Sequence, residues 1–409
     1  MLRDLRGEAV SGATPAALDE FERALDLFLA CRGNAGAPVR AACEAAPGFA
    51  MAFALEACLQ LSGRDPAGGR QALRVLACFR GEPALPRERL HFAAIRALAR
   101  GDYDQARHLH DELLAEHPRD VLAVQIAHSF DYVAGDARSL RDRIAWVLPA
   151  WSAADPGYHA LLSMHAFGLE ECGEYALAED TALRALELNP RDLRAHHAVT
   201  HVLEMLERAE AGMRWMGSRT AYWLDDGPAA MHLWWHLALH HLGAGRQRHA
   251  LMLYDQRIGV PRGRSMSALI DASALLWRLE LMHVDVGSRW QALADRWAPH
   301  AADAFCAFND LHAMMAFIGA GRDELAQRLI AAQEARIGAG GANATMTRLV
   351  GLPACRALRA YGRGDYAEAE RQLRRLPPVA HRIGGSLAQR NVLEMTREAA
   401  VQRALPIAA

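Results

Sequence analysis

The chain of 409 residues contains no lysine, so all 46 of its Lys-or-Arg positions are arginine. A Walker-type phosphate loop requires a lysine, and the segment GAGGANAT at residue 338 therefore resembles such a loop only in its glycine content. The arginines are balanced by 48 acidic residues, which gives a formal net charge of −2. Neither this balance nor the spacing of aromatic and basic residues favours nucleic acid or an anionic membrane as a partner.

Long apolar runs and paired cysteines are also missing. No window approaches about 18 uninterrupted apolar residues, which predicts that no segment spans a membrane. The opening MLRDLRGEAVSG has no apolar core of the length found in signal peptides. The seven cysteines are odd in number and form no C-x-x-C pair, so we expect free thiols in a cytoplasmic protein.

Several motifs of well-known enzyme classes are absent from the sequence. The chain has no G-x-S-x-G, no H-E-x-x-H and no G-x-G-x-x-G after a strand. Segments with the composition of β-strands are scarce, whereas alanine and leucine dominate. These absences argue against α/β-hydrolases, zincin proteases and dinucleotide-binding enzymes.

What the chain does contain is a ladder of glycines, most of which are spaced by about 34 to 38 residues or by about twice that distance. The glycines follow apolar segments and precede the next helical pattern; they are Gly101, Gly135, Gly173, Gly245, Gly321 and Gly364. A period in this range is typical of a helix–turn–helix unit that is stacked many times. The pattern matches the tetratricopeptide repeat.

The residue types around these glycines fit such a unit. Small residues at Ala94 and Ala106 allow two helices to approach closely, and the glycine ends the first helix in a left-handed cap. Pro118 and Pro190 end the second helix, because proline cannot continue one. We therefore predict an all-α protein, an α-solenoid of about ten stacked tetratricopeptide-like repeats that forms a curved superhelix.

We expect one solenoid domain over residues 1–409, with three zones. Residues 1–85 carry degenerate repeats, 86–260 the clearest repeats, and 261–409 looser repeats and a cap. The last zone is interrupted by predicted loops at PRGRSMS from residue 261 and GAGGANATM from residue 338.

Four longer segments carry a family resemblance. They begin with AFGLEECGEYALAEDTALRALELNPRDLRAHHAVTHVLEM and continue with HLWWHLALHHLGAGRQRHALMLYDQRI, DASALLWRLELMHVDVGSRWQALA and FNDLHAMMA. In order and spacing they resemble the tetratricopeptide repeat protein 38 family, over about residues 15 to 400. The resemblance implies a curved α-helical repeat protein and carries no settled activity.

Histidines provide the first candidate site. His197, His201 and Glu204 are spaced i, i+4 and i+7, so they lie in one line on a predicted helix. His232 and His236 form a second i, i+4 pair on the next first helix, and adjacent helices pack about 8–10 Å apart. These five residues are candidate ligands of a divalent transition metal such as zinc, iron or manganese. A hydrogen-bonded lining without metal and a metal-free small-molecule or catalytic pocket are the alternatives.

Other polar residues stand inside otherwise apolar helices, where they are uncommon unless paired. Candidates for ligand binding are Arg194, Trp235, Asp271, Arg278 and Asn309. Candidates for catalysis are Glu204, Asp310 and His312. An ion pair between Asp271 and Arg278 is the structural alternative for these two residues.

Two functions remain from the sequence. The first is a repeat protein that binds a small ligand or a partner peptide in a histidine-rich concave pocket. The second is a metal-dependent hydrolytic or oxidative enzyme, in which Glu204 or Asp310 would act as general base on a metal-bound water. The sequence leaves a homodimer open.

Overall fold

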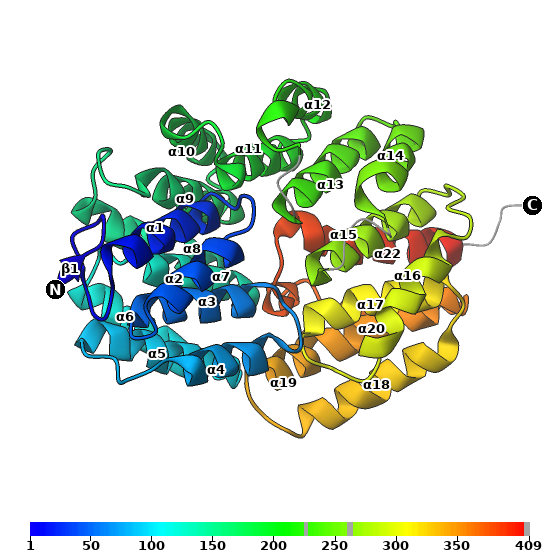
Figure 1. Cartoon of the computed structure of the whole chain (residues 1–409). Coiled ribbons are helices and arrows are strands. Elements are labelled where there is room, and N and C mark those ends of the chain that lie inside the picture. Colours follow the sequence, from blue (N-terminus) through cyan, green and yellow to red (C-terminus); the bar gives the residue numbers. More distant parts are fainter. Residues whose placement is uncertain (225–227, 260–264, 405–409) are drawn as a thin grey trace, which may run out of the picture. The chain divides into compact units, whose positions relative to one another are not determined.

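The computed structural model describes residues 1–224, 228–259 and 265–404, and it is all-helical apart from one short hairpin in that part of the chain (Figure 1). The predicted fold class is thereby confirmed, and the consecutive helix pairs are consistent with a repeat solenoid.

All six glycines of the ladder adopt the predicted left-handed conformation, with φ between +68° and +81°. At Gly101 the backbone N–H of Asp102 donates to the carbonyl of Ala97 at 3.0 Å, and the N–H of Gly101 donates to Leu98 at 2.9 Å. This pair of bonds is the Schellman motif, which satisfies carbonyls at a helix end. The repeat spacing in the sequence therefore marks real helix ends.

The chain divides into two compact units. The first comprises Met1–Tyr132, Ala137–Val202 and Gly217–Ala230, and the second comprises Val133–Asp136, Leu203–Met216 and Met231–Ala409. Their boundaries do not follow the three zones expected from the sequence, and the expectation of a single solenoid stays a prediction.

In the first unit, consecutive helices pack in pairs: α1 with α2, α3 with α4, α5 with α6, and α9 with α10. Helices α7 and α8 lie between the last two pairs in the chain. The bounds are α1 Pro15–Leu29, α2 Gly36–Ala45, α3 Ala50–Ser62, α4 Gly68–Cys78, α5 Pro86–Ala99, α6 Tyr103–Glu116, α7 Val121–Ala134, α8 Ala137–Val147, α9 Tyr158–Glu171, α10 Tyr175–Leu188 and α11 Leu193–Met205. Helices α6 and α10 end two residues before Pro118 and Pro190, as predicted.

A small β-hairpin at the N-terminus was not expected from the sequence. Strands β1 (Leu2–Arg3) and β2 (Ala9–Val10) pair antiparallel. Arg87 fixes the hairpin, because its guanidinium donates to the Ala9 carbonyl at 3.0 Å and to the buried Asp120 carboxylate at 2.6 Å. The hairpin is thus tied to α5 and to the start of α7 by a buried ion pair.

Two aspartates cap helices and also bind histidines of the preceding repeat. Asp120 accepts from the Ala123 N–H in the first turn of α7 and contacts His91 at 2.8 Å. Asp192 does the same for α11, where the Ala195 N–H donates at 3.1 Å and His159 lies at 2.7 Å. The start of α11, which carries the histidine line, is therefore held by a cap and by a neighbouring helix.

The second unit continues the pairing with longer connections. Its helices are α12 Ala209–Gly217, α13 Pro228–Gly243, α14 Gln247–Leu253, α15 Met266–Leu281, α16 Arg289–Trp297, α17 Ala307–Gly319, α18 Asp323–Ile337, α19 Ala342–Met346, α20 Leu352–Gly362, α21 Tyr366–Leu373 and α22 Leu387–Ala404. The first helix of one pair packs against the first helix of the next, as α15 does against α17 and α17 against α20. The terminal α22 packs on α15, where the Trp277 indole N–H donates to the Thr396 hydroxyl at 2.9 Å.

The two loops predicted in this part have different outcomes. The first four residues of PRGRSMS, 261–264, lie outside the described residues, and α15 begins after Ser265, whose hydroxyl accepts from Ala268 N–H. The segment GAGGANATM is a loop only up to Gly341, because α19 begins at Ala342 and runs into a π-helical turn at Thr347–Gly351. The glycine content therefore marked a helix start rather than a long loop.

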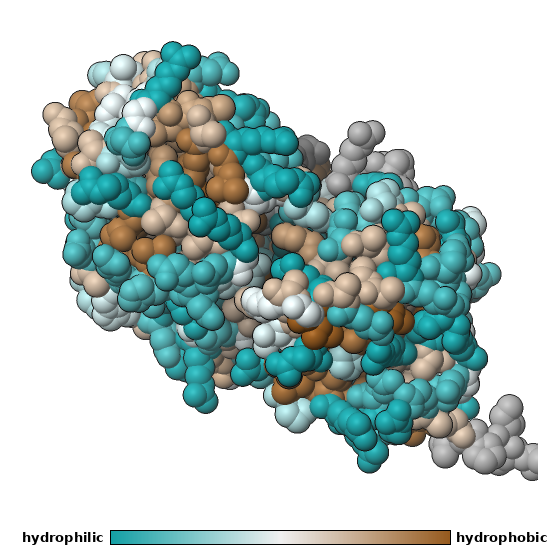
Figure 2. Space-filling view, turned by 90° about the horizontal axis from the view of Figure 1, so that it is seen from below, coloured by the Kyte–Doolittle hydropathy of each residue, from teal (hydrophilic) through white to brown (hydrophobic). Residues whose placement is uncertain are grey.

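Hydrophilic side chains cover most of the face seen in Figure 2, with hydrophobic residues in scattered patches. Among the described helices, none is long and apolar enough to cross a membrane. All seven cysteines are free thiols, as expected.

Candidate metal centre

Helix α11 presents the first histidine pair. His197 and His201 lie one turn apart, and their ring centroids are 4.3 Å from each other. Phe167 of α9 packs against both rings, with both centroid distances at 5.4 Å. His201 is fully buried, whereas His197 is partly exposed. The aromatic contacts and the helix therefore hold both rings in place.

Helix α13 presents the second pair in the same way. The ring centroids of His232 and His236 are 4.7 Å apart. Trp235, which is fully buried, stacks on His232 and meets the edge of His236. Again one ring is buried, that of His236, and the other is partly exposed.

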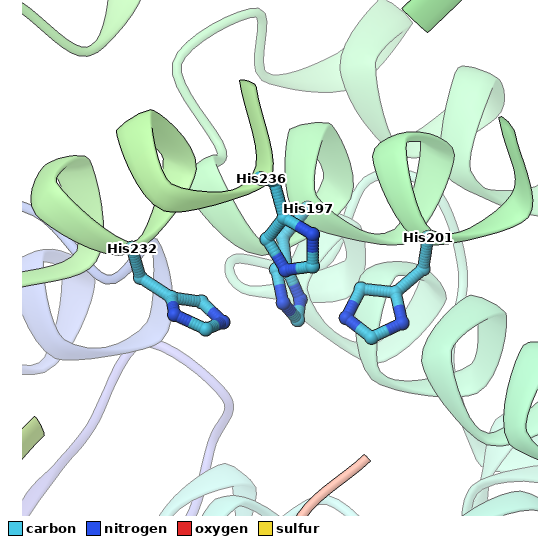
Figure 3. A group of neighbouring side chains, drawn as sticks. All are labelled: His197, His201, His232 and His236. Carbon is cyan, nitrogen blue, oxygen red and sulfur yellow. The ribbon is translucent and has the colours of Figure 1, made fainter. Parts of the chain in front are cut away.

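The four imidazoles turn toward a common space in Figure 3. One ring nitrogen from each of His197, His201, His232 and His236 lies within 4.8 Å of the others, a grouping that could hold a metal ion. The sequence spacing places each pair on one helix face, and their role as metal ligands stays a prediction. Glu204, the fifth predicted ligand, is not a member of this group.

Glu204 instead supports one of the histidines. Its carboxylate lies 2.9 Å from Nδ1 of His236, and Asp271 of α15 lies 3.0 Å from Nδ1 of His232. A carboxylate on one ring nitrogen fixes the ring and its tautomer and leaves the other nitrogen as a metal ligand. Such outer partners are typical of metal-binding histidines.

The electrostatics of His232 follow from the same contact. Burial lowers the pKa of His232, but the Asp271 carboxylate raises it, and the net pKa stands above the usual value for histidine. A metal ion would have to compete with a proton for this ring at low pH.

A third carboxylate faces His201. Its Nδ1 lies 3.3 Å from a carboxylate oxygen of Glu170, near the end of α9, and both side chains are fully buried. Glu171, also buried, completes a group in which one ligand atom of each residue lies within 4.8 Å of the others. We did not predict Glu170, Glu171 or their contact with His201, because the segment LEECGEY reads as an ordinary charged helix end.

The candidates for ligand binding lie in different surroundings. Arg194 donates to the side chains of Gln125 and Cys31, at 3.0 and 3.2 Å, which ties α11 to its neighbours. Asp271 holds His232, and Trp235 packs against the histidine rings. Asn309 is buried on α17.

Arg278 is buried and bonded to the backbone. It donates to the carbonyls of Ala274 and Ala388 at 3.1 and 2.7 Å, and its guanidinium lies over Trp235. Burial lowers the pKa of Arg278 to about 10. In the described structure, Asp271 and Arg278 are bonded to other groups rather than to each other, so the alternative of a direct ion pair is not what holds them.

Two catalytic candidates, Asp310 and His312, do not join the histidine group among the described residues. His312 donates from Nδ1 to the Phe308 carbonyl at 2.7 Å, one turn back on α17. Asp310 accepts from the Gln333 amide at 3.1 Å. Burial raises the pKa of Asp310 to about 7, although the Gln333 bond lowers it and Asp303 raises it further.

A cavity of about 650 Å³ lies in the second unit beside the end of α11. Its wall combines apolar side chains with several charged groups. Among its lining residues are Glu204, Glu207, Leu373, Leu376, Pro377, His381, Leu387, Arg390, Leu393 and Glu394. Glu204 therefore touches both this cavity and the ring of His236.

No known protein-family model matches the chain. The site is consequently described by its own chemistry: two histidine pairs, and a carboxylate at Nδ1 of three of the four rings.

Proposed function

We propose that this protein is a metal-binding helical-repeat protein, in which His197, His201, His232 and His236 hold one divalent transition-metal ion. The observation that carries the proposal is that one ring nitrogen of each of these four histidines lies within 4.8 Å of the others, and a carboxylate at Nδ1 of His232 and of His236 adds support. Metal-binding histidines are commonly held by a carboxylate on the nitrogen that does not bind the metal.

Two local features support the positions of these histidines: the geometry of helix α11 and the contact of Glu204 with His236. Helix α11 is continuous, so His197 and His201 are placed relative to Glu204 by helix geometry alone. Glu204 in turn binds His236 of α13, and both belong to the second unit. The helix thus fixes His197 and His201 relative to Glu204, and the Glu204 contact orients the ring of His236.

The ligand types favour zinc or iron over manganese. Neutral imidazole suits zinc, copper, iron and nickel, whereas manganese prefers carboxylate and carbonyl oxygens. Four imidazoles fill a tetrahedral zinc ion and would make it structural, because catalytic zinc keeps an open position. An iron ion takes more ligands than zinc and would keep room for water or substrate. A metal-dependent enzyme would need this arrangement, and we propose it as the alternative function.

We propose further that a small organic molecule occupies the cavity of about 650 Å³ beside Glu204. The volume falls within the range of small-molecule sites, and the mixture of apolar and charged side chains in the wall suits a small molecule that carries both apolar and polar groups. A peptide needs a longer groove. Glu204 would link the two sites physically, because it borders the cavity and its carboxylate orients the ring of His236.

Family and location stay proposals of the same kind. The resemblance to the tetratricopeptide repeat protein 38 family supports a curved superhelix, and free thiols support a reducing compartment such as the cytoplasm.

The test is metal content by plasma mass spectrometry on untagged protein purified without chelators. We expect at least one equivalent of zinc or iron in the wild type and a loss of it in the His236→Ala variant. His300→Ala is the matched control, because His300 is partly exposed and pairs with Asp303. A wild type that stays empty after reconstitution with each metal would refute the proposal.

A further inference from the structure

We propose that Glu170, Glu171 and Nδ1 of His201 form a second cation site, so that His201 bridges two metal ions. This inference rests on the proposed four-histidine centre. The three residues belong to the first unit, and one ligand atom of each lies within 4.8 Å of the others.

The distance between His201 and Glu170 distinguishes them from the other two pairs. Two ligand atoms of one tetrahedral zinc ion, each about 2.1 Å from the metal, lie about 3.4 Å apart. The separation of 3.3 Å between Nδ1 of His201 and the Glu170 oxygen matches that value. The corresponding contacts of His232 and His236 are 3.0 and 2.9 Å, as in ordinary hydrogen bonds.

Placing the two glutamates inside the protein at the end of a helix costs free energy, and a bound cation would offset part of that cost. Glu170 is fully buried and Glu171 is 8% exposed. Both lie in the last turn of α9, which ends at Glu171, and the C-terminal end of a helix carries partial negative charge. Two carboxylates in this place are disfavoured both by burial and by the helix dipole, and a divalent ion lowers both costs.

Figure 3 shows how His201 can serve both sites. One of its ring nitrogens points toward the other three histidines. Nδ1 faces Glu170. A neutral imidazole has one lone pair for a metal and one N–H. Binding of the second ion therefore displaces the Nδ1 proton to the solvent, and His201 becomes an imidazolate with one ion on each nitrogen.

The experiment is a titration of the metal-free full-length protein with zinc, followed by removal of loosely bound metal and counting of the zinc retained. Two equivalents are expected in the wild type, and one in the Glu171→Gln variant, which keeps the side-chain shape. Glu187→Gln, at an exposed position on α10, should retain two. Calorimetry in buffers of different ionisation enthalpy should show about one more proton released by the wild type than by Glu171→Gln.

The outcomes separate the two proposals. No retained zinc would refute the four-histidine centre and the second site together. One equivalent in the wild type, unchanged in Glu171→Gln, would leave the four-histidine centre standing and overturn the second site, with Glu170 then only orienting His201. The wild-type count decides this even if the variant fails to fold.

Discussion

Asp310→Asn should make the protein more stable at neutral pH, and the gain should grow as the pH rises. Burial raises the pKa of Asp310 to about 7, while the pKa of an aspartate in the unfolded chain stays near its ordinary value of 3.8. Between these values the folded protein holds a proton that the unfolded chain has lost. Stability must therefore fall as the pH rises from about 4 to about 7 and level off above that.

The size of the effect follows from the shift. Each unit of pKa difference is worth about 1.4 kcal/mol, so ionising Asp310 costs the folded state on the order of 4 kcal/mol above pH 7. Asparagine has nearly the same shape and its oxygen can still accept from Gln333, but it does not ionise. Between pH 4.5 and pH 8 the variant should gain about 3 kcal/mol relative to the wild type.

The assay is urea unfolding of both proteins at pH 4.5, 6 and 8, followed by tryptophan fluorescence. Asp323→Asn serves as the control of opposite sign, because side-chain bonds from Arg359, Arg363 and Gln327 lower the pKa of Asp323. That variant should lose stability at neutral pH. If the difference between Asp310→Asn and wild type is the same at all three pH values, the carboxyl does not titrate in this range and the reasoning is wrong.

Three further predictions concern the site and the repeat turns. Glu204→Gln should weaken metal binding by about 10- to 100-fold, because the outer partner of His236 is weakened, and competition with a chelator measures this against a Glu207→Gln control. Gly101→Ala should cost about 1 kcal/mol in unfolding free energy, since φ is +76° there and an added Cβ meets no atom, whereas Gly63→Ala, at φ −83°, should cost nothing. Asp192→Ala should lower the unfolding free energy by about 1 kcal/mol through the lost cap alone, and Asp192→Asn should restore that part.

The elements that could be predicted from the sequence are those with local causes. A left-handed glycine such as Gly101 or Gly173 is required by the conformation of a single residue, and a proline after a helix acts within one turn. The i, i+4 spacing of His197 with His201, and of His232 with His236, likewise follows from the pitch of one helix. Each of these features can be predicted without knowing which residues pack against that helix.

The carboxylate partners could not be predicted in the same way. Glu170, which contacts His201, precedes it by 31 residues, and Asp271, which contacts His232, follows it by 39. Which of 48 acidic side chains meets a given ring depends on the rotation of two packed helices. Asp271 stands out as a polar residue in an apolar helix, but the sequence does not show that its hydrogen-bond partner is His232 rather than Arg278.

The N-terminal hairpin is a second feature that could not be predicted from the sequence. Two strands of two residues carry no periodicity that a sequence pattern can reveal, and their stability comes from Arg87, whose partner Asp120 lies 33 residues further along the chain. The charged residues of this protein are thus most informative where they are buried. Buried charges join successive repeats in the first unit, and a carboxylate in contact with a histidine recurs at His232 and His236 of the proposed metal centre.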